Sequence, residues 1–74
     1  MTDASPSEIG IVVNGAGTVV EFGTSVSTLV AHLGLELSQI ALERNLRILP
    51  KADWGGTILS EGDQIEIVHF VGGG

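Results

Sequence analysis

Apolar and polar residues alternate along several short stretches of this chain, as they do in strands that bury one face. Most of these stretches are rich in Val and Ile, which favour extended backbone. Asn14 and Gly15 follow the first stretch, and both residue types tolerate the positive φ that a tight hairpin turn requires. Pro50 ends a shorter stretch that is typical of an edge strand. The predicted strands are residues 8–14, 18–22, 40–45, 47–49 and 65–71.

One stretch has the period of a helix instead. Its apolar residues recur at i, i+3, i+4 and i+7, which places them on a single face. Ser25 precedes the stretch as a predicted N-cap, because its hydroxyl can accept a backbone N–H. Gly34 follows it as the predicted end of the helix, and Pro50 opens a further single helical turn. The apolar stripe consists of Val26, Leu29, Val30 and Leu33.

The predicted order β-β-α-β-β-β indicates one domain of the α+β class, with a mixed sheet of about five strands and one main helix on one face. The first and last strands are the most apolar, so we expect them at the centre. We expect residues 1–7 to be a disordered lead-in, 8–71 the folded domain and 72–74 a flexible glycine tail. The helix stripe is predicted to pack on Ile11, Val13, Ile40, Leu42, Ile65 and Ile67.

The sheet face away from the helix is predicted to be open to solvent. On the last strand this face carries Glu66, Val68 and Phe70. Exposed Val and Phe beside the tail favour a docking site for a partner. The alternative is that Phe70 folds over the sheet edge.

Charge and hydropathy narrow the choice of partner. The net charge is −6 and the basic residues are Arg44, Arg47 and Lys51, so we expect no nucleic-acid partner, which would need a basic footprint. An acidic surface suits a basic protein partner. No apolar run approaches the ~20 residues of a membrane span, and the N-terminus does not resemble a signal peptide. We therefore expect no membrane partner and a cytoplasmic protein.

Residue combinations that would support catalysis are missing. There is no cysteine, and the two histidines are far apart in the sequence, which predicts no metal site. Glu61 and Asp63 flank Gly62 in a predicted turn, where carboxylates are usually solvated. We therefore expect that the chain is not itself an enzyme. The one unusual reactive group is the α-carboxylate of Gly74, which is ionised at neutral pH and becomes a good electrophile only after activation, for example by adenylation.

With Gly62-Asp63-Gln64-Ile65 near its end and Gly72-Gly73-Gly74 after the last strand, the chain resembles the ThiS family, the ubiquitin-like sulfur carriers of thiazole (thiamine) biosynthesis. The resemblance extends from Ile9 to Gly74. Its strongest part is a Gly-Asp-x-Ile turn and strand followed by terminal glycines. There are two departures, a longer lead-in and Leu46 where a glycine is common. The matching segments are residues 11–15, 25–30, 41–45, 48–51, Trp54, 59–67 and 68–74.

The resemblance implies a β-grasp fold and a carrier that binds no cofactor itself. A ThiF-like adenylating enzyme would use ATP to activate Gly74, and a donor such as a persulfide would convert it to a thiocarboxylate. A ThiG-like thiazole synthase would then take the sulfur. Gly72 and Gly73 would form the thin tail that enters the partner. The expected docking residues are Val68 and Phe70 with the acidic residues Glu61, Asp63 and Glu66.

Other functions are compatible with the same residues. A MoaD-like carrier for molybdopterin shares the fold, although such chains tend to end with prolines before Gly-Gly, unlike Phe70-Val71 here. A ubiquitin-like modifier would join its tail to lysines of target proteins. A plain interaction module would carry an inert tail.

Overall fold

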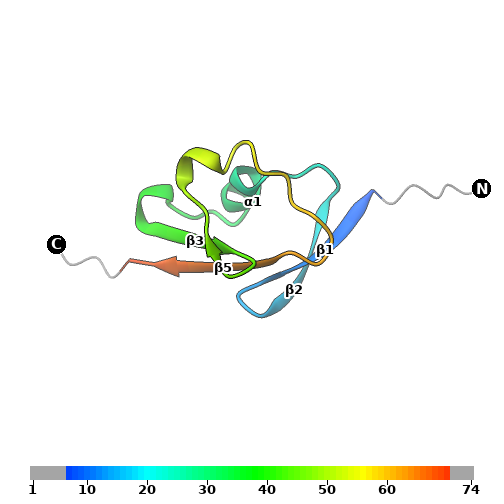
Figure 1. Ribbon diagram of the computed structural model, residues 1–74. Coiled ribbons are helices and arrows are strands. Elements are labelled where there is room, and N and C mark those ends of the chain that lie inside the picture. Colours follow the sequence, from blue (N-terminus) through cyan, green and yellow to red (C-terminus); the bar gives the residue numbers. More distant parts are fainter. Residues whose placement is uncertain (1–6, 71–74) are drawn as a thin grey trace, which may run out of the picture.

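The computed structural model describes residues 7–70 and contains one mixed five-stranded sheet with a helix across one face (Figure 1). The predicted α+β class and element order are confirmed. The elements are β1 (Glu8–Val13), β2 (Ala16–Glu21), α1 (Val26–His32), the 3₁₀ turn η1 (Leu37–Gln39), β3 (Ile40–Arg44), β4 (Arg47–Ile48), the 3₁₀ turn η2 (Lys51–Asp53) and β5 (Gln64–His69).

The strands lie in the order β2-β1-β5-β3-β4. β1 and β5 are parallel neighbours, and every other pair is antiparallel. The first and last strands therefore occupy the interior of the sheet, as predicted. Residues 72–74, the predicted tail, lie outside the described residues. Of the predicted lead-in, Ser7 is described, and its C=O already accepts a hydrogen bond from the Phe22 N–H at 2.9 Å.

The two tight turns of the sheet need left-handed backbone. Asn14 and Gly15 join β1 to β2 with φ of 49° and 82°. β2 begins at Ala16, two residues before the predicted strand 18–22, so the connection is shorter than predicted. Asn45 and Leu46 join β3 to β4 with φ of 54° and 72°. Leu46 has a Cβ in a region that glycine occupies without strain, and its side chain is 84% exposed.

α1 begins and ends at the predicted residues. The Ser25 Oγ accepts the Thr28 N–H at 3.1 Å and caps the first turn. At the other end the Leu35 N–H donates to the Val30 C=O and the Gly34 N–H to the Ala31 C=O, the pair of bonds of a Schellman motif. Gly34 has a φ of 72°, which this motif requires.

The prediction that Leu33 packs into the core is wrong. Leu33 is the C-cap residue of α1, and its side chain is 43% exposed. Its position on the helical stripe is right, but the helix ends at His32 and the chain turns away there. A residue at the end of so short a helix extends past the part of the sheet that the helix covers.

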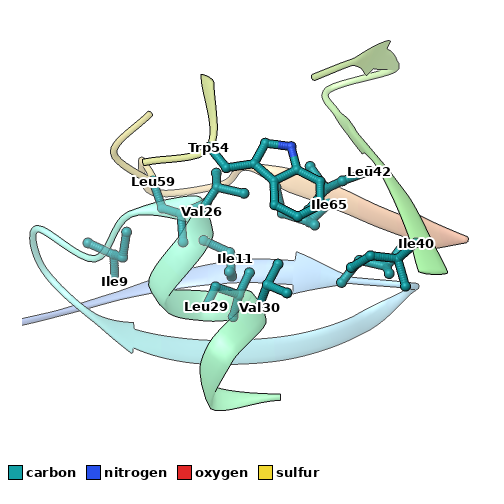
Figure 2. Close-up of a cluster of buried hydrophobic side chains, with 11 residues drawn as sticks. Ile9, Ile11, Val26, Leu29, Val30, Ile40, Leu42, Trp54, Leu59 and Ile65 are labelled. Carbon is teal, nitrogen blue, oxygen red and sulfur yellow. The ribbon is translucent and has the colours of Figure 1, made fainter. Parts of the chain in front are cut away.

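The buried core joins this helix to the sheet (Figure 2). Its members from α1, β3 and β5 are those that the sequence pattern predicted, apart from Leu33. Of the two β1 residues predicted to face the helix, Ile11 is buried and Val13 is only partly buried. Trp54 and Leu59 are buried as well, although they belong to irregular segments between β4 and β5. Trp54 keeps its polar atom satisfied, because its Nε1–H donates to the Leu49 C=O at 2.8 Å. The core consists of Ile9, Ile11, Val26, Leu29, Val30, Ile40, Leu42, Trp54, Leu59, Ile65 and Ile67.

Candidate functional site

The C-terminal end of β5 pairs with β3 and precedes Val71 and the terminal glycines in the sequence. The Phe70 N–H donates to the C=O of Gln39 in η1 at 2.8 Å, which anchors the last described residue to the body. Val68 and Phe70 are each 55% exposed, so the expectation that they face solvent is confirmed. The chain beyond Phe70 therefore starts from a fixed point on the molecule.

Lys51 lies beside this end of β5. Its Nζ is 5.8 Å from the centroid of the Phe70 ring, within the range of a cation–π contact. Lys51 belongs to η2, which follows β4, so the contact joins two segments that are far apart in the sequence. It helps to hold the Phe70 ring in place and sets one positive charge next to the start of the tail.

The open face next to Val68 carries paired carboxylates. Glu66 on β5 lies directly opposite Glu43 on β3, and Glu43 lies opposite Ile48 on β4. Like charges that face each other across two strands destabilise a sheet, so a basic partner would relieve this repulsion. Ile48 is 73% exposed and extends the apolar part of the face to the sheet edge. We call Ile48, Glu43, Glu66, Val68 and Phe70 the open-face patch.

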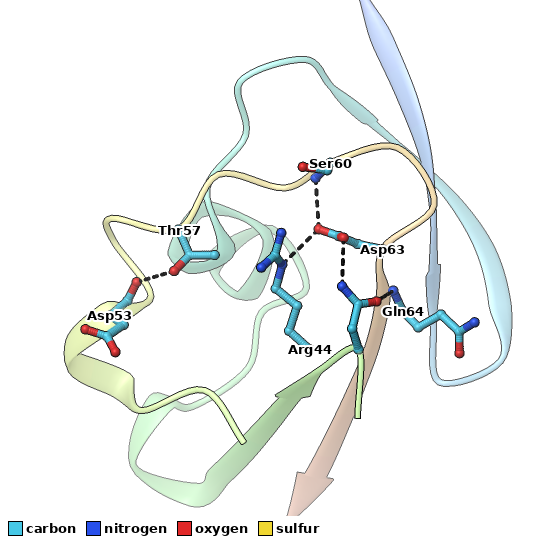
Figure 3. Close-up of polar contacts among 7 residues, drawn as sticks. Arg44, Asp53, Thr57, Ser60, Asp63 and Gln64 are labelled. Carbon is cyan, nitrogen blue, oxygen red and sulfur yellow. Dashed lines mark hydrogen bonds and ion pairs between the residues drawn. The ribbon is translucent and has the colours of Figure 1, made fainter. Parts of the chain in front are cut away.

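The expectation that Asp63 is a solvated turn residue is wrong. Asp63 is 5% exposed, and its Oδ2 accepts hydrogen bonds from the Arg44 Nε–H at 3.0 Å and the Ser60 N–H at 2.8 Å (Figure 3). The Asn45 Nδ2–H donates to its Oδ1 at 3.1 Å. Asp63 therefore ties the turn before β5 to the end of β3, and it is not part of the exposed surface.

Burial by itself would raise the pKa of Asp63, since it penalises the charged form. The hydrogen bonds from Ser60, Asn45 and Arg44, together with the Arg44 charge, outweigh this and hold the pKa below its ordinary value. The carboxylate is thus ionised and saturated by partners. Among residues 7–70 this is also the single ion pair with atoms in contact.

Glu61 is exposed but lies far from the C-terminal end of β5. One oxygen of its carboxylate accepts the Gly10 N–H of β1 at 2.9 Å. β5, with six residues, separates Glu61 from Phe70, and a strand of this length is roughly 20 Å long. The structure therefore brings Glu66 together with Val68 and Phe70, and it places Glu61 and Asp63 at the opposite end of the strand.

Sequence reasoning missed Glu43, Ile48 and Lys51 as members of this surface. Glu43 and Ile48 were available from the alternation on β3 and β4, because their partner positions follow once the strand order is known. No pattern in the sequence indicated that Lys51 would lie beside Phe70. The predicted tail residues Gly72, Gly73 and Gly74 lie outside the described residues. Within residues 7–70 no three His, Cys, Asp or Glu side chains form a cluster able to hold a metal, and no helix of this part is long and apolar enough to cross a membrane.

A match to a known protein family identifies the family of this chain. The ThiS family model matches residues 6–74. The chain belongs to the ThiS family. Its fold is accordingly the ubiquitin-like β-grasp, as predicted, and the crystal structure of the thiamine biosynthesis protein ThiS from Geobacter metallireducens superimposes with a TM-score of 0.78. That structure is 26% identical in sequence, and the match covers 89% of this chain and 100% of the other.

The chain is similar in sequence to a sulfur carrier protein and to two thiazole synthases. The sulfur carrier protein ThiS of Bacillus subtilis is 42% identical over 50 residues, which cover 68% of this chain and 76% of that protein. The thiazole synthase of Magnetococcus marinus is 41% identical over 61 residues, which cover 82% of this chain and 19% of that protein. The thiazole synthase of Paramagnetospirillum magneticum matches in the same way, at 38% identity. This chain spans about a fifth of the length of these two enzymes.

Proposed function

We propose that this chain is a sulfur carrier of thiamine biosynthesis. The observation that carries the proposal is the match to the ThiS family over residues 6–74. The similarity to the Bacillus subtilis sulfur carrier supports the same function. Two thiazole synthases contain a segment like this chain, which supports a ThiG-like thiazole synthase as the enzyme that receives the sulfur.

The reaction begins at the Gly74 carboxylate. One of its oxygens attacks the α-phosphorus of ATP bound to a ThiF-like adenylating enzyme, and the bond to the β-phosphate oxygen breaks. Pyrophosphate leaves, and Gly74 becomes an acyl-adenylate. The mixed anhydride makes the carbonyl carbon electrophilic, because AMP is a far better leaving group than an oxide.

Sulfur enters in the second step. The terminal sulfur of a donor persulfide attacks the Gly74 carbonyl carbon, AMP leaves, and an acyl persulfide forms. A second thiol then attacks the sulfur of the donor, so that a disulfide forms and the Gly74 thiocarboxylate is released. The thiocarboxylate is the nucleophile that thiazole synthase consumes, and the carrier is a protein co-substrate.

The contribution of the carrier is to place the Gly74 carboxylate next to the ATP on the adenylating enzyme. The open-face patch docks on the adenylating enzyme, with its apolar residues against an apolar surface and Glu43 and Glu66 against basic groups. Docking makes attack on ATP effectively intramolecular. Gly73 and Gly74 have no Cβ, so they fit a slot too narrow for other residues.

Intact-mass spectrometry tests the proposal. We expect wild-type chain incubated with the adenylating enzyme, ATP and a persulfide donor to exchange one oxygen for one sulfur on its C-terminal fragment. Gly73→Val should reduce this conversion by at least about a hundredfold, and deletion of Gly74 should abolish it, since the loss of aligned geometry alone can cost this much. The matched control is Gly17→Val, because Gly17 is an exposed glycine of β2 with open space around its Cβ position.

The outcomes separate the possible functions. Conversion of the Gly73→Val chain at the wild-type rate would show that the tail is not the reactive element. Transfer of sulfur to a molybdopterin precursor in place of the thiazole would identify a MoaD-like carrier. An isopeptide bond to lysine would identify a ubiquitin-like modifier, and an unchanged wild-type mass would leave the interaction module.

A further inference from the structure

β2 forms one outer edge of the sheet (Figure 1). Just after this strand, the Phe22 N–H donates to the Ser7 C=O on the β1 side. The hydrogen-bonding groups of a strand alternate in direction from one residue to the next, so those of Gly17, Val19 and Glu21 point away from β1. Among residues 7–70 no strand pairs with this edge, which leaves a row of main-chain groups available to another chain.

This edge lacks the features that usually protect an edge strand. β2 has six residues and contains neither proline nor lysine, and its register with β1 runs from Ala16 to Glu21 without a bulge. The opposite edge, β4, has only two residues. Proteins commonly keep an edge unpaired by shortening it, bending it or placing lysine or proline on it. A longer, regular edge such as β2 is a template on which an extended segment can add as a further strand.

A groove runs beside this edge, between β2 and α1. Its volume is about 480 Å³, which is within the range of ligand sites in proteins. Thr28 and His32 are four residues apart on α1 and so share one face of the helix, which forms one wall of the groove. A strand added to β2 would lie in this groove and direct alternate side chains toward α1. The lining includes Glu8, Val20, Glu21, Thr24, Thr28 and His32.

The charge around the groove favours a basic occupant. Glu8 and Glu21 lie directly opposite each other on β1 and β2, where like charges destabilise the pairing of the strands. Residues 7–39 contain no Lys or Arg, and the three basic residues of the chain belong to β3, β4 and η2. A Lys or Arg side chain that approached the two glutamates would relieve their repulsion and would meet no positive charge from these residues.

We propose that the groove between β2 and α1 binds an extended basic segment of a partner protein, which adds to β2 as a sixth strand. The segment pairs with the N–H and C=O of Val19 and with the N–H of Glu21, and its Lys or Arg side chains contact Glu8 and Glu21. A second copy of the chain is a poorer occupant, because each copy has a net charge of −6 and the two would repel. Binding in this groove does not require the chemistry at Gly74.

The groove lies far from the open-face patch. Val13 of β1 pairs with Ile65 of the parallel strand β5. Glu8 lies five residues before Val13, and Phe70 lies five residues after Ile65, so roughly 33 Å of strand separates Glu8 from Phe70 along the sheet. Figure 1 shows the start of β1 and the end of β5 at opposite ends of the sheet. A segment bound in the groove therefore leaves the exposed end of β5 accessible.

Titration of the wild-type chain with the capped peptide Lys-Val-Arg-Val-Lys-Val, followed by amide hydrogen exchange, tests the proposal. At saturating peptide, exchange should slow at least about tenfold at the Val19 and Glu21 amides, which gain partners, and change little at the Val20 amide, which points toward β1. The same peptide methylated at every backbone nitrogen keeps its charges but cannot donate, so it should not bind. Unchanged exchange at Val19 and Glu21 up to the solubility limit of the peptide overturns the proposal, and so does equal binding of the methylated peptide.

Charge variants place the peptide on the molecule. Glu21→Gln should weaken peptide binding about threefold, the size of an exposed ion pair. Glu36→Gln is the matched control, because it removes the same charge at an exposed residue of another segment, and it should bind as wild type. Equal weakening by both variants would assign the effect to net charge and overturn the groove as the site. Loss of peptide binding by Phe70→Ala would place the peptide on the open-face patch and overturn it as well.

Sedimentation equilibrium separates the proposed occupant from a second copy. We expect the free chain to be a monomer and to remain one when the peptide is bound. A dimer that the peptide dissociates would show that β2 pairs with β2 of another copy, and it would overturn the proposal of a basic partner segment.

Discussion

The two ends of β5 differ in burial and in hydrogen bonding. At its start, the Asp63 carboxylate is buried and accepts hydrogen bonds from three groups, so that the strand is fixed to the end of β3. At its end, Val68 and Phe70 are more than half exposed. One strand therefore starts at a structural anchor and ends at an exposed surface, which we propose as the interaction surface.

The difference separates an acidic residue that stabilises the fold from one that is left exposed for the proposed partner. Asp63 and Glu66 are three residues apart, and both look like surface carboxylates in the sequence. Asp63 has Arg44 and Asn45 within hydrogen-bond distance, whereas Glu66 faces another carboxylate, Glu43. A carboxylate with cationic and amide partners stabilises the fold, and one held against a like charge is available for a basic partner.

The largest effect on stability should come from the core at the start of the strand. Ile65 is 1% exposed, so Ile65→Ala loses burial and leaves a cavity, at a cost of roughly 2–5 kcal/mol in the free energy of unfolding. Val68→Ala, near the other end, should change it by less than about 0.5 kcal/mol. Chemical denaturation measures both. Equal losses would show that the two ends do not differ in burial.

The next effect concerns the anchor. Asp63→Asn removes the charge that Arg44 contacts and turns an acceptor into a donor, so we expect a loss of roughly 1–3 kcal/mol of stability. Glu61→Gln is the matched control two residues earlier, since its amide oxygen can still accept the Gly10 N–H. Denaturation curves that are the same for both variants would contradict the anchor role of Asp63.

Phe70→Ala should weaken binding to the partner and leave the stability of the fold nearly unchanged. We expect the complex with the adenylating enzyme to weaken by more than about 1 kcal/mol, while the melting temperature changes little because the ring is 55% exposed. Val19→Ala is the control, because Val19 is 64% exposed but lies on the edge strand β2. Isothermal titration measures both affinities. A wild-type affinity for Phe70→Ala would remove Phe70 from the docking surface.

The smallest effect is a pH dependence of the anchor. The pKa of Asp63 is lower in the folded chain than in the unfolded chain, so its contribution is complete above the unfolded pKa of about 3.9 and is lost as the pH falls through the folded value. The stability difference between wild type and Asp63→Asn should be constant from neutral pH to about pH 5 and then shrink, by at most roughly 1.4 kcal/mol per pH unit. A difference that stays constant down to pH 2 would mean that Asp63 keeps its proton-binding behaviour on folding.

The fold was largely predictable because its signals are local. Alternation placed Ile65 and Ile67 inside and Glu66 outside, and Ser25 capped the helix as its hydroxyl predicts. The candidate site was predictable for Val68 and Phe70, which share the same alternation. It was not predictable for Lys51, whose contact with Phe70 joins residues far apart in the chain.

The sequence by itself determined the order of the elements, the buried stripes and the family, because periodicity, caps and turn residues act over a few positions. Only the tertiary structure decided which polar residues are structural. The parallel pairing of β1 and β5 sets the Asn14 amide against Ile67, 53 positions away, and the contact between the ends of β3 and β5 buries Asp63. Such contacts depend on which strands become neighbours, and that choice follows from burying the helix and both central strands together.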